Sequence, residues 1–172
     1  MADPAKLAAK LLADYAPGKF PVPVEDIAHA LKVEIVRKRH DGPESSFTLR
    51  DGAKLILGLN NNTSSRRQRV AIGHALGHLL MHGKTIIVCN AVRLARPGIA
   101  SRGSDEEEAQ ANAFAADMLM PPKVVAAVFA TRDGQAEALF PRDEVVAELA
   151  KKFDVSSEFM CYRLVSPGLL AS

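Results

Sequence analysis

The chain has 172 residues, of which 48% are hydrophobic and 24% charged, with 22 Lys and Arg against 20 Asp and Glu. This composition excludes a predominantly disordered chain, and a net charge of +2 gives no electrostatic argument for nucleic-acid binding. Two cysteines outside any CxxC pair exclude a disulfide scaffold and a zinc ribbon, and no apolar stretch approaches the roughly 20 residues of a membrane span. We therefore expect a single cytoplasmic domain over residues 1–172.

The first third of the chain predicts two helices followed by a small antiparallel sheet. Asp3 is a suitable N-cap for the first helix, which belongs to an N-terminal segment of helix and loop over residues 1–22. Apolar and charged residues then alternate, which is typical of strands, and Asp51-Gly52 between two apolar runs is a hairpin signal. The expected elements are helices over residues 4–15 and 24–31 and strands over 32–39, 46–50 and 53–59.

The rest of the chain is predicted to be mostly helical. Ser64 or Ser65 can cap a long helix that runs to His82, and the acidic first turn of a later helix near Asp105 suits the helix dipole. We expect helices over residues 65–82, 105–120, 123–130, 142–152 and 156–165, a strand or buried loop over 85–89 and an irregular loop over 90–104. The fold class is therefore α+β, with sheet and metal-binding helices over 23–122 and C-terminal helices over 123–172.

Two histidines carry the first indication of chemistry. His74 and His78 are four residues apart on a predicted helix, so both imidazoles lie on one face and can reach one metal ion. Ordinary helix histidines are the alternative. The apolar flanking residues favour a metal, because two buried imidazoles need polar partners.

A third ligand must come from another element. His82 lies about 12 Å from His74 along a helix axis, too far to share the same ion, and is better interpreted as a last-turn residue favoured by the helix dipole. The best candidate is Glu108 at the start of the acidic helix, with Asn112 one turn later as a polar residue behind the ligands. Zinc suits two imidazoles and one carboxylate best, and manganese is the alternative.

Position 75 departs from the HExxH motif, in which the glutamate is the general base. The motif here reads His74-Ala75-Leu76-Gly77-His78. The missing glutamate is not a metal ligand, so its loss leaves metal binding possible. A methyl group cannot exchange a proton, and a positioned general base contributes about 10²–10⁴-fold to the rate.

Three ordered blocks resemble the ImmA/IrrE family of zinc metallopeptidases. The blocks read R-x-x-x-G-H-x-x-G-H-L-L-x-H over Arg69–His82, E-x-x-A-N-x-F-A-A-x-x-L-M-P over Glu108–Pro121, and L-A-x-x-F-x-V-S-x-x-x-M-x-x-R-L over Leu149–Leu164. Together they cover roughly residues 20–165, and it is their combination that is specific.

The resemblance implies a thermolysin-like, gluzincin arrangement with zinc held by His74, His78 and Glu108. It also implies a substrate, namely a helix-turn-helix transcriptional repressor whose cleavage induces mobile-element or stress-response genes. By analogy with gluzincins, the strand over Lys54–Leu59 could pair with an extended substrate. The candidate substrate-binding residues on it are Leu55, Leu57 and Leu59.

The alanine at position 75 has two alternative explanations. The intact remainder of the motif favours an inactivating substitution in a working peptidase. A natural pseudopeptidase that acts as a protein-binding module is the alternative.

Other features have weaker interpretations. Residues 142–164 resemble a DNA-binding helix-turn-helix, but the second helix offers only Arg163 to bases or phosphates, which disfavours direct DNA binding. The run Arg66, Arg67 and Arg69 is interpreted as a solvated face, with contact to an acidic substrate as the alternative. Cys89 and Cys161 are interpreted as small buried hydrophobic residues rather than metal ligands.

Overall fold

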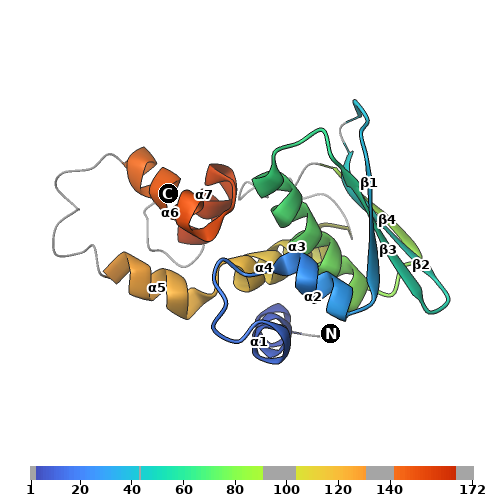
Figure 1. Ribbon diagram of the computed structural model, residues 1–172, viewed down its shortest axis with the longest axis horizontal. Coiled ribbons are helices and arrows are strands. Elements are labelled where there is room, and N and C mark those ends of the chain that lie inside the picture. The colour runs from blue at the N-terminus through green and yellow to red at the C-terminus, as the bar shows by residue number, and fades with distance from the viewer. Residues whose placement is uncertain (1–2, 43, 91–103, 131–141, 166–172) are drawn as a thin grey trace.

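The structure, a computed structural model, describes residues 3–42, 44–90, 104–130 and 142–165. Seven helices and four strands within these ranges confirm the α+β class (Figure 1). The helices are α1 (Pro4–Tyr15), α2 (Val24–Ala30), α3 (Ser65–Met81), α4 (Ser104–Leu119), α5 (Pro122–Ala130), α6 (Arg142–Phe153) and α7 (Ser157–Val165). The strands are β1 (Val33–Lys38), β2 (Glu44–Asp51), β3 (Lys54–Asn60) and β4 (Ile86–Asn90). Residues 91–103 of the predicted loop lie outside the described ranges.

Side-chain caps set where the predicted helices begin. The Oδ1 of Asp3 accepts a hydrogen bond of 3.0 Å from the backbone N–H of Ala5, which satisfies a free donor in the first turn of α1. Ser64 accepts from the N–H of Arg67 in the same way at the start of α3. That helix ends where His82 turns to extended backbone, so its predicted bounds are confirmed to within one residue. None of the described helices combines the length and apolar character that a membrane crossing requires.

The four strands form one sheet in the order β1-β3-β2-β4. The predicted hairpin is confirmed: β2 and β3 are antiparallel, and Gly52 takes the positive φ of 56° that its turn requires. The expectation of a purely antiparallel sheet is wrong, because β1 pairs with β3 in parallel, with Val33 opposite Leu55. The reason is that β3, a nearly continuous apolar run, takes a central position between the two strands that precede it in the chain.

The central position of β3 overturns the prediction that this strand pairs with a substrate. Both of its edges are already hydrogen-bonded, to β1 on one side and β2 on the other, so no edge is free for strand addition. Leu57 and Leu59 are buried in the core, and Leu55 is half-buried against it. These three leucines are therefore packing residues, and the outer strands of the sheet are β1 and β4.

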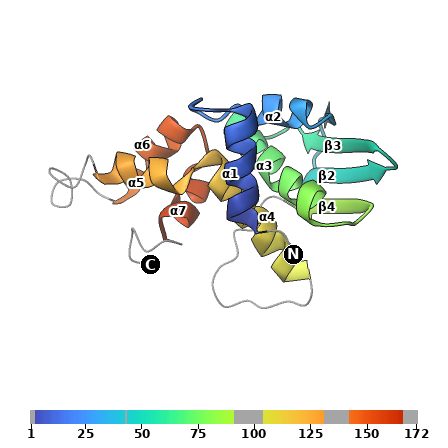
Figure 2. The same cartoon turned by 90° about the horizontal axis from the view of Figure 1, so that it is seen from below.

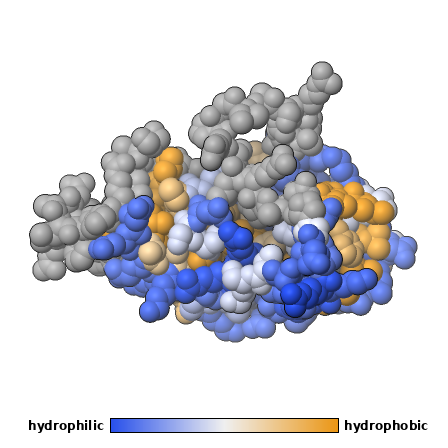
Figure 3. Space-filling model, turned by 90° about the horizontal axis from the view of Figure 1, so that it is seen from above, coloured by the Kyte–Doolittle hydropathy of each residue, from blue (hydrophilic) through white to orange (hydrophobic). Residues whose placement is uncertain are grey.

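One face of the sheet packs on helix α3, α4 packs against α3, and α1 packs against α4 (Figures 1 and 2). The opposite face carries exposed apolar side chains, and Figure 3 shows hydrophobic surface at the sheet end of the molecule. The exposed large residues of this face are Val36, Phe47, Ile86 and Val88. Among the described residues the helices thus cover one face of the sheet, and the candidate metal centre lies beside that face, α3 and α4.

Two glycines let α3 and α4 approach closely. A Cβ atom at Gly77 would lie 3.0 Å from the Cα of Ala111, and one at Gly73 would lie 3.3 Å from the Cβ of Ala115. A side chain at Gly77 would therefore force backbone apart rather than displace a flexible neighbour. The short distance between the helices brings polar residues of α4 within reach of the histidines on α3.

The C-terminal helices are attached to α3 and α4 by ion pairs. Asp154, in the turn between α6 and α7, lies 3.3 Å from the Nε of Arg66 and 3.2 Å from the Nε of Arg69. On α7, an Nη atom of Arg163 lies 2.9 Å from a carboxylate oxygen of Asp117 on α4, and both side chains are largely buried. These charges hold the α6–α7 pair against the rest of the fold.

Candidate metal centre

Helix α3 presents two buried imidazoles to the same point. His74 and His78 are each 1% exposed, and their Nε2 atoms are 3.0 Å apart. The spacing of four residues places them one turn apart on the helix face that meets α4 and the sheet. This is the geometry that the sequence predicts for the pair.

Helix α4 adds the carboxylate of Glu108. Its Oε2 lies 3.2 Å from the Nε2 of His74, and its Oε1 lies 3.1 Å from the Nε2 of His78. The structure therefore brings together the three residues that the sequence predicts as metal ligands. Glu108 is 43% exposed, so the centre is reachable from solvent on the α4 side.

The outer nitrogens of both imidazoles are held by protein groups. The Nδ1 of His74 donates to the Oδ1 of Asn112 at 2.9 Å, so Asn112 supports a histidine rather than the carboxylate beside it. The Nδ1 of His78 lies 2.9 Å from the Nδ1 of His82, whose Nε2 in turn lies 3.1 Å from the Oε1 of Gln110. An amide oxygen only accepts, so His82 donates from Nε2 and accepts from His78 at Nδ1.

With Nδ1 as the donor, the Nε2 atoms of His74 and His78 point at one another and at Glu108. Two lone pairs 3.0 Å apart, beside a carboxylate, repel unless a proton or a cation lies between them. Fixing the outer nitrogen of a metal-binding histidine with an oxygen or imidazole acceptor is the usual way proteins orient such ligands. His82 thus lies at the helix end, as predicted, with the added role of orienting His78.

Cys89 on strand β4 is the residue that sequence reasoning missed. It is buried, as predicted, but its sulfur belongs to a group of ligand atoms from His74, His78, Glu108 and Cys89 that all lie within 4.8 Å of one another. In the structure Ile86 and Val88 are exposed and Cys89 is buried, but the sequence of Ile86–Asn90 is apolar from Ile86 to Cys89 and does not show which side chains face inward. Nothing local indicates that Cys89 lies opposite the histidines, because that depends on the pairing of β4 with β2.

The four side chains of this cluster shift one another's pKa values, as expected of groups that share protons. Burial alone lowers the pKa of His74, but hydrogen bonds with Cys89 and Glu108 outweigh it and raise that pKa to about 9, and the pKa of His78 is raised for the same reasons. Burial raises the pKa of Cys89, yet the two imidazoles lower it to about 7. Hydrogen bonds from both histidines lower the pKa of Glu108. A cation at the centre would satisfy the same thiolate and carboxylate.

The donor set fits a tetrahedral zinc ion. With Zn–N distances near 2.0–2.1 Å, neighbouring nitrogen or oxygen ligands of a tetrahedron are about 3.3 Å apart, close to the 3.0, 3.1 and 3.2 Å separations among His74, His78 and Glu108. Only small shifts are needed to place an ion between them. Imidazole and thiolate ligands favour zinc over magnesium or calcium.

Ala75 lies directly after the first histidine and is fully buried, at 0% exposure. Its methyl group belongs to the hydrophobic core. The position that holds the general base in HExxH therefore contributes packing and no proton-transfer group.

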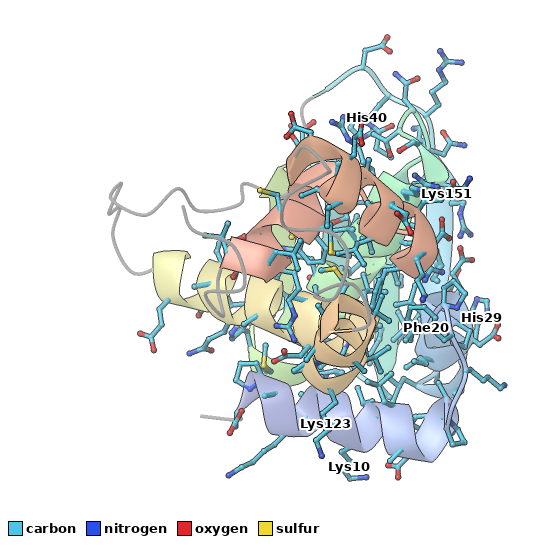
Figure 4. The ribbon with its side chains drawn as sticks, turned by 90° about the vertical axis from the view of Figure 1, so that its left-hand side faces the viewer. Lys10, Phe20, His29, His40, Lys123 and Lys151 are labelled. Atoms are coloured by element: carbon cyan, nitrogen blue, oxygen red, sulfur yellow. The ribbon has the colours of Figure 1, made fainter. Side chains whose placement is uncertain are left out.

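The two remaining histidines and the predicted arginine run lie away from this centre. His29 on α2 and His40 after β1 project at separate edges of the molecule (Figure 4), and His29 is exposed. The arginine run of α3 forms ion pairs with the α6–α7 pair, Arg67 through Glu158 at 3.5 Å. The interpretation of this run as a solvated face is therefore wrong for Arg69, whose side chain is 16% exposed, and holds for Arg67, whose side chain is 62% exposed.

Most of the chain matches a known family profile. The profile described as the IrrE N-terminal-like domain, Peptidase_M78, matches residues 26–165. The match includes all four residues of the metal centre. No curated protein sequence matches the chain.

Proposed function

Because the chain belongs to the IrrE N-terminal-like domain family of peptidases, we propose that it is a zinc-binding metallopeptidase of the ImmA/IrrE type. In the form with Ala75 it retains the metal and hydrolyses peptide bonds poorly. The observation that carries the proposal is the convergence of His74, His78 and Glu108 on one point beside a buried methyl group.

Each residue of the centre has a distinct role in this proposal. His74 and His78 bind through Nε2 and Glu108 through its carboxylate, while Asn112 and His82 orient the imidazoles. When bound, zinc supplies Lewis acidity that polarises the scissile carbonyl. The half-exposed carboxylate of Glu108 leaves the site accessible to a peptide on the α4 side.

The missing function is proton transfer. A glutamate at position 75 would remove a proton from the attacking water and pass it to the leaving amine. The methyl group of Ala75 does neither, so we expect a rate about 10²–10⁴-fold below that of a glutamate-bearing form.

The resemblance to ImmA/IrrE proteins supports a helix-turn-helix repressor as the protein substrate, which requires a cytoplasmic location. Direct DNA binding by this chain has less support, because Arg163, the basic residue of the second C-terminal helix, is paired with Asp117. The small net charge of +2 also gives no support to direct DNA binding.

The test compares Ala75→Glu with Ala75→Gln, which has the same size and no base. Because Cys89 offers a further ligand atom, both variants are made with Cys89 present and in a Cys89→Ala background. We expect zinc-dependent cleavage of a helix-turn-helix repressor by Ala75→Glu in at least one background, and none by Ala75→Gln in either. If well-folded, zinc-loaded Ala75→Glu variants cleave nothing in both backgrounds, the chain is not a disabled peptidase.

A natural pseudopeptidase that binds a protein partner is the second candidate. The observation in its favour is that Ala75 fits the core without leaving an unpaired polar group, as a native residue would. The identity of codon 75 in the natural gene separates the two: a glutamate codon supports an inactivated peptidase, and an alanine codon supports a pseudopeptidase.

A further inference from the structure

We propose that Cys89 is a fourth protein ligand and closes the metal site, so that zinc is held by two imidazoles, one carboxylate and one thiolate. This inference rests on the proposed binding of zinc by His74, His78 and Glu108. It goes further by assigning the coordination position that a peptidase keeps free.

The sheet directs Cys89 at the ligands. Cys89 is 2% exposed, whereas Val88 beside it is 59% exposed on the outer face. Pairing with β2 sets Cys89 opposite Ser46, whose side chain is also buried on the inner face. The backbone of β4, and not a flexible loop, therefore holds the sulfur beside α3.

The distances fit a single four-coordinate ion. All four ligand atoms lie within 4.8 Å of one another. In a tetrahedral site with Zn–S near 2.3 Å and Zn–N near 2.0–2.1 Å, a sulfur and a nitrogen ligand are about 3.6 Å apart. Since no two of the four ligand atoms are more than 4.8 Å apart, their separations need to shorten by about 1.2 Å at most to reach that geometry.

Ligand number distinguishes two kinds of zinc site. Catalytic sites have three protein ligands and one open position, whereas structural sites have four protein ligands. Here the fourth ligand and the buried methyl of Ala75 are separate features on different elements. Both remove something hydrolysis needs, an open coordination position in one case and a general base in the other. The closed site would instead tie the outer strand β4 to helices α3 and α4.

The test is X-ray absorption at the zinc edge on the full chain loaded with one equivalent of zinc. We expect a sulfur neighbour at about 2.3 Å in addition to nitrogen and oxygen neighbours. Cys89→Ser should lose the sulfur neighbour, while Cys161→Ser, which changes the exposed cysteine, should retain it. Substitution by Co²⁺ gives a second readout, since a thiolate-to-cobalt charge-transfer band should be present in the unmodified chain and absent in Cys89→Ser.

The outcomes separate the inference from the proposed function. Bound zinc with only nitrogen and oxygen neighbours in the unmodified chain overturns the role of Cys89 and leaves the metal site intact. A folded chain that binds no zinc overturns both. In the Ala75→Glu background, cleavage that rises at least tenfold when Cys89 is replaced by Ala supports the closed site, and equal cleavage with and without Cys89 contradicts it.

Discussion

The two ends of helix α3 use polar residues in opposite ways. At its start, Arg66 and Arg69 share the carboxylate of Asp154 and Arg67 pairs with Glu158, so each positive charge meets an acidic side chain of the α6–α7 pair. At its end, His74 and His78 meet each other and one carboxylate. Their outer nitrogens bond to protein groups outside the cluster, and their inner nitrogens converge on Glu108. Pairing of opposite charges indicates a structural role, and convergence of two imidazoles on one carboxylate indicates a site for a cation.

The largest effect should come from His78→Ala, because it removes one of the converging ligands and the hydrogen bond to His82. Zinc binding at one equivalent should be lost, measured by competition with a chromogenic chelator. His29→Ala, which removes an exposed histidine of α2, is the matched control and should leave the affinity unchanged. Equal zinc binding by both variants would contradict the assignment of the centre to α3.

Asn112→Ala tests whether the outer hydrogen bonds orient the ligands. The Nδ1 of His74 would lose its acceptor, and removal of such a partner typically lowers metal affinity about 10–100-fold. The same competition assay measures the change, and Asn112→Asp, which keeps an acceptor oxygen, should restore most of the affinity. An unchanged zinc affinity in Asn112→Ala would mean that packing alone positions His74.

Arg69→Met tests the structural end of the helix. The guanidinium donates to the carbonyl oxygens of Val22 and Asp154 and is only 16% exposed, so its loss removes two part-buried hydrogen bonds and the ion pair with Asp154. We expect the free energy of unfolding to fall by about 1–3 kcal/mol, measured by urea denaturation. Zinc affinity of the folded variant should be unchanged, and a loss of zinc affinity comparable to that of Asn112→Ala would break the distinction between the two ends.

The smallest effect should come from Arg67→Met. Its ion pair with Glu158 spans 3.5 Å between side chains that are 62% and 70% exposed, and such pairs contribute about 0–1 kcal/mol. The free energy of unfolding should therefore change little, and less at high salt. A destabilisation as large as that of Arg69→Met would show that exposure is the wrong measure of what these arginines contribute.

Whether a feature could be predicted from the sequence depends on whether its contacts are local or distant in the chain. Caps and periodicity predict the helices, and the spacing of His74 and His78 predicts their shared face, because both depend on residues near in sequence. Glu108 follows from the requirement for a third ligand on the next acidic helix. These predictions need only local geometry and one helix–helix contact.

The errors arise where distant strands pair. The prediction of an antiparallel sheet fails for β1 because β3 enters between two earlier strands, and the substrate role of Leu55, Leu57 and Leu59 fails with it. The position of Cys89 beside the histidines could not be predicted, because its neighbours are set by the register of β4 on β2. The roles of Arg66 and Arg69 depend in the same way on Asp154, more than eighty residues away in the sequence.

The most direct test of the metal centre is zinc binding by the unmodified full-length chain after dialysis against a chelator. We expect the apo chain to take up one zinc ion per molecule and His78→Ala to take up none. An unmodified chain that is folded by circular dichroism and binds no zinc when offered one equivalent would contradict the account.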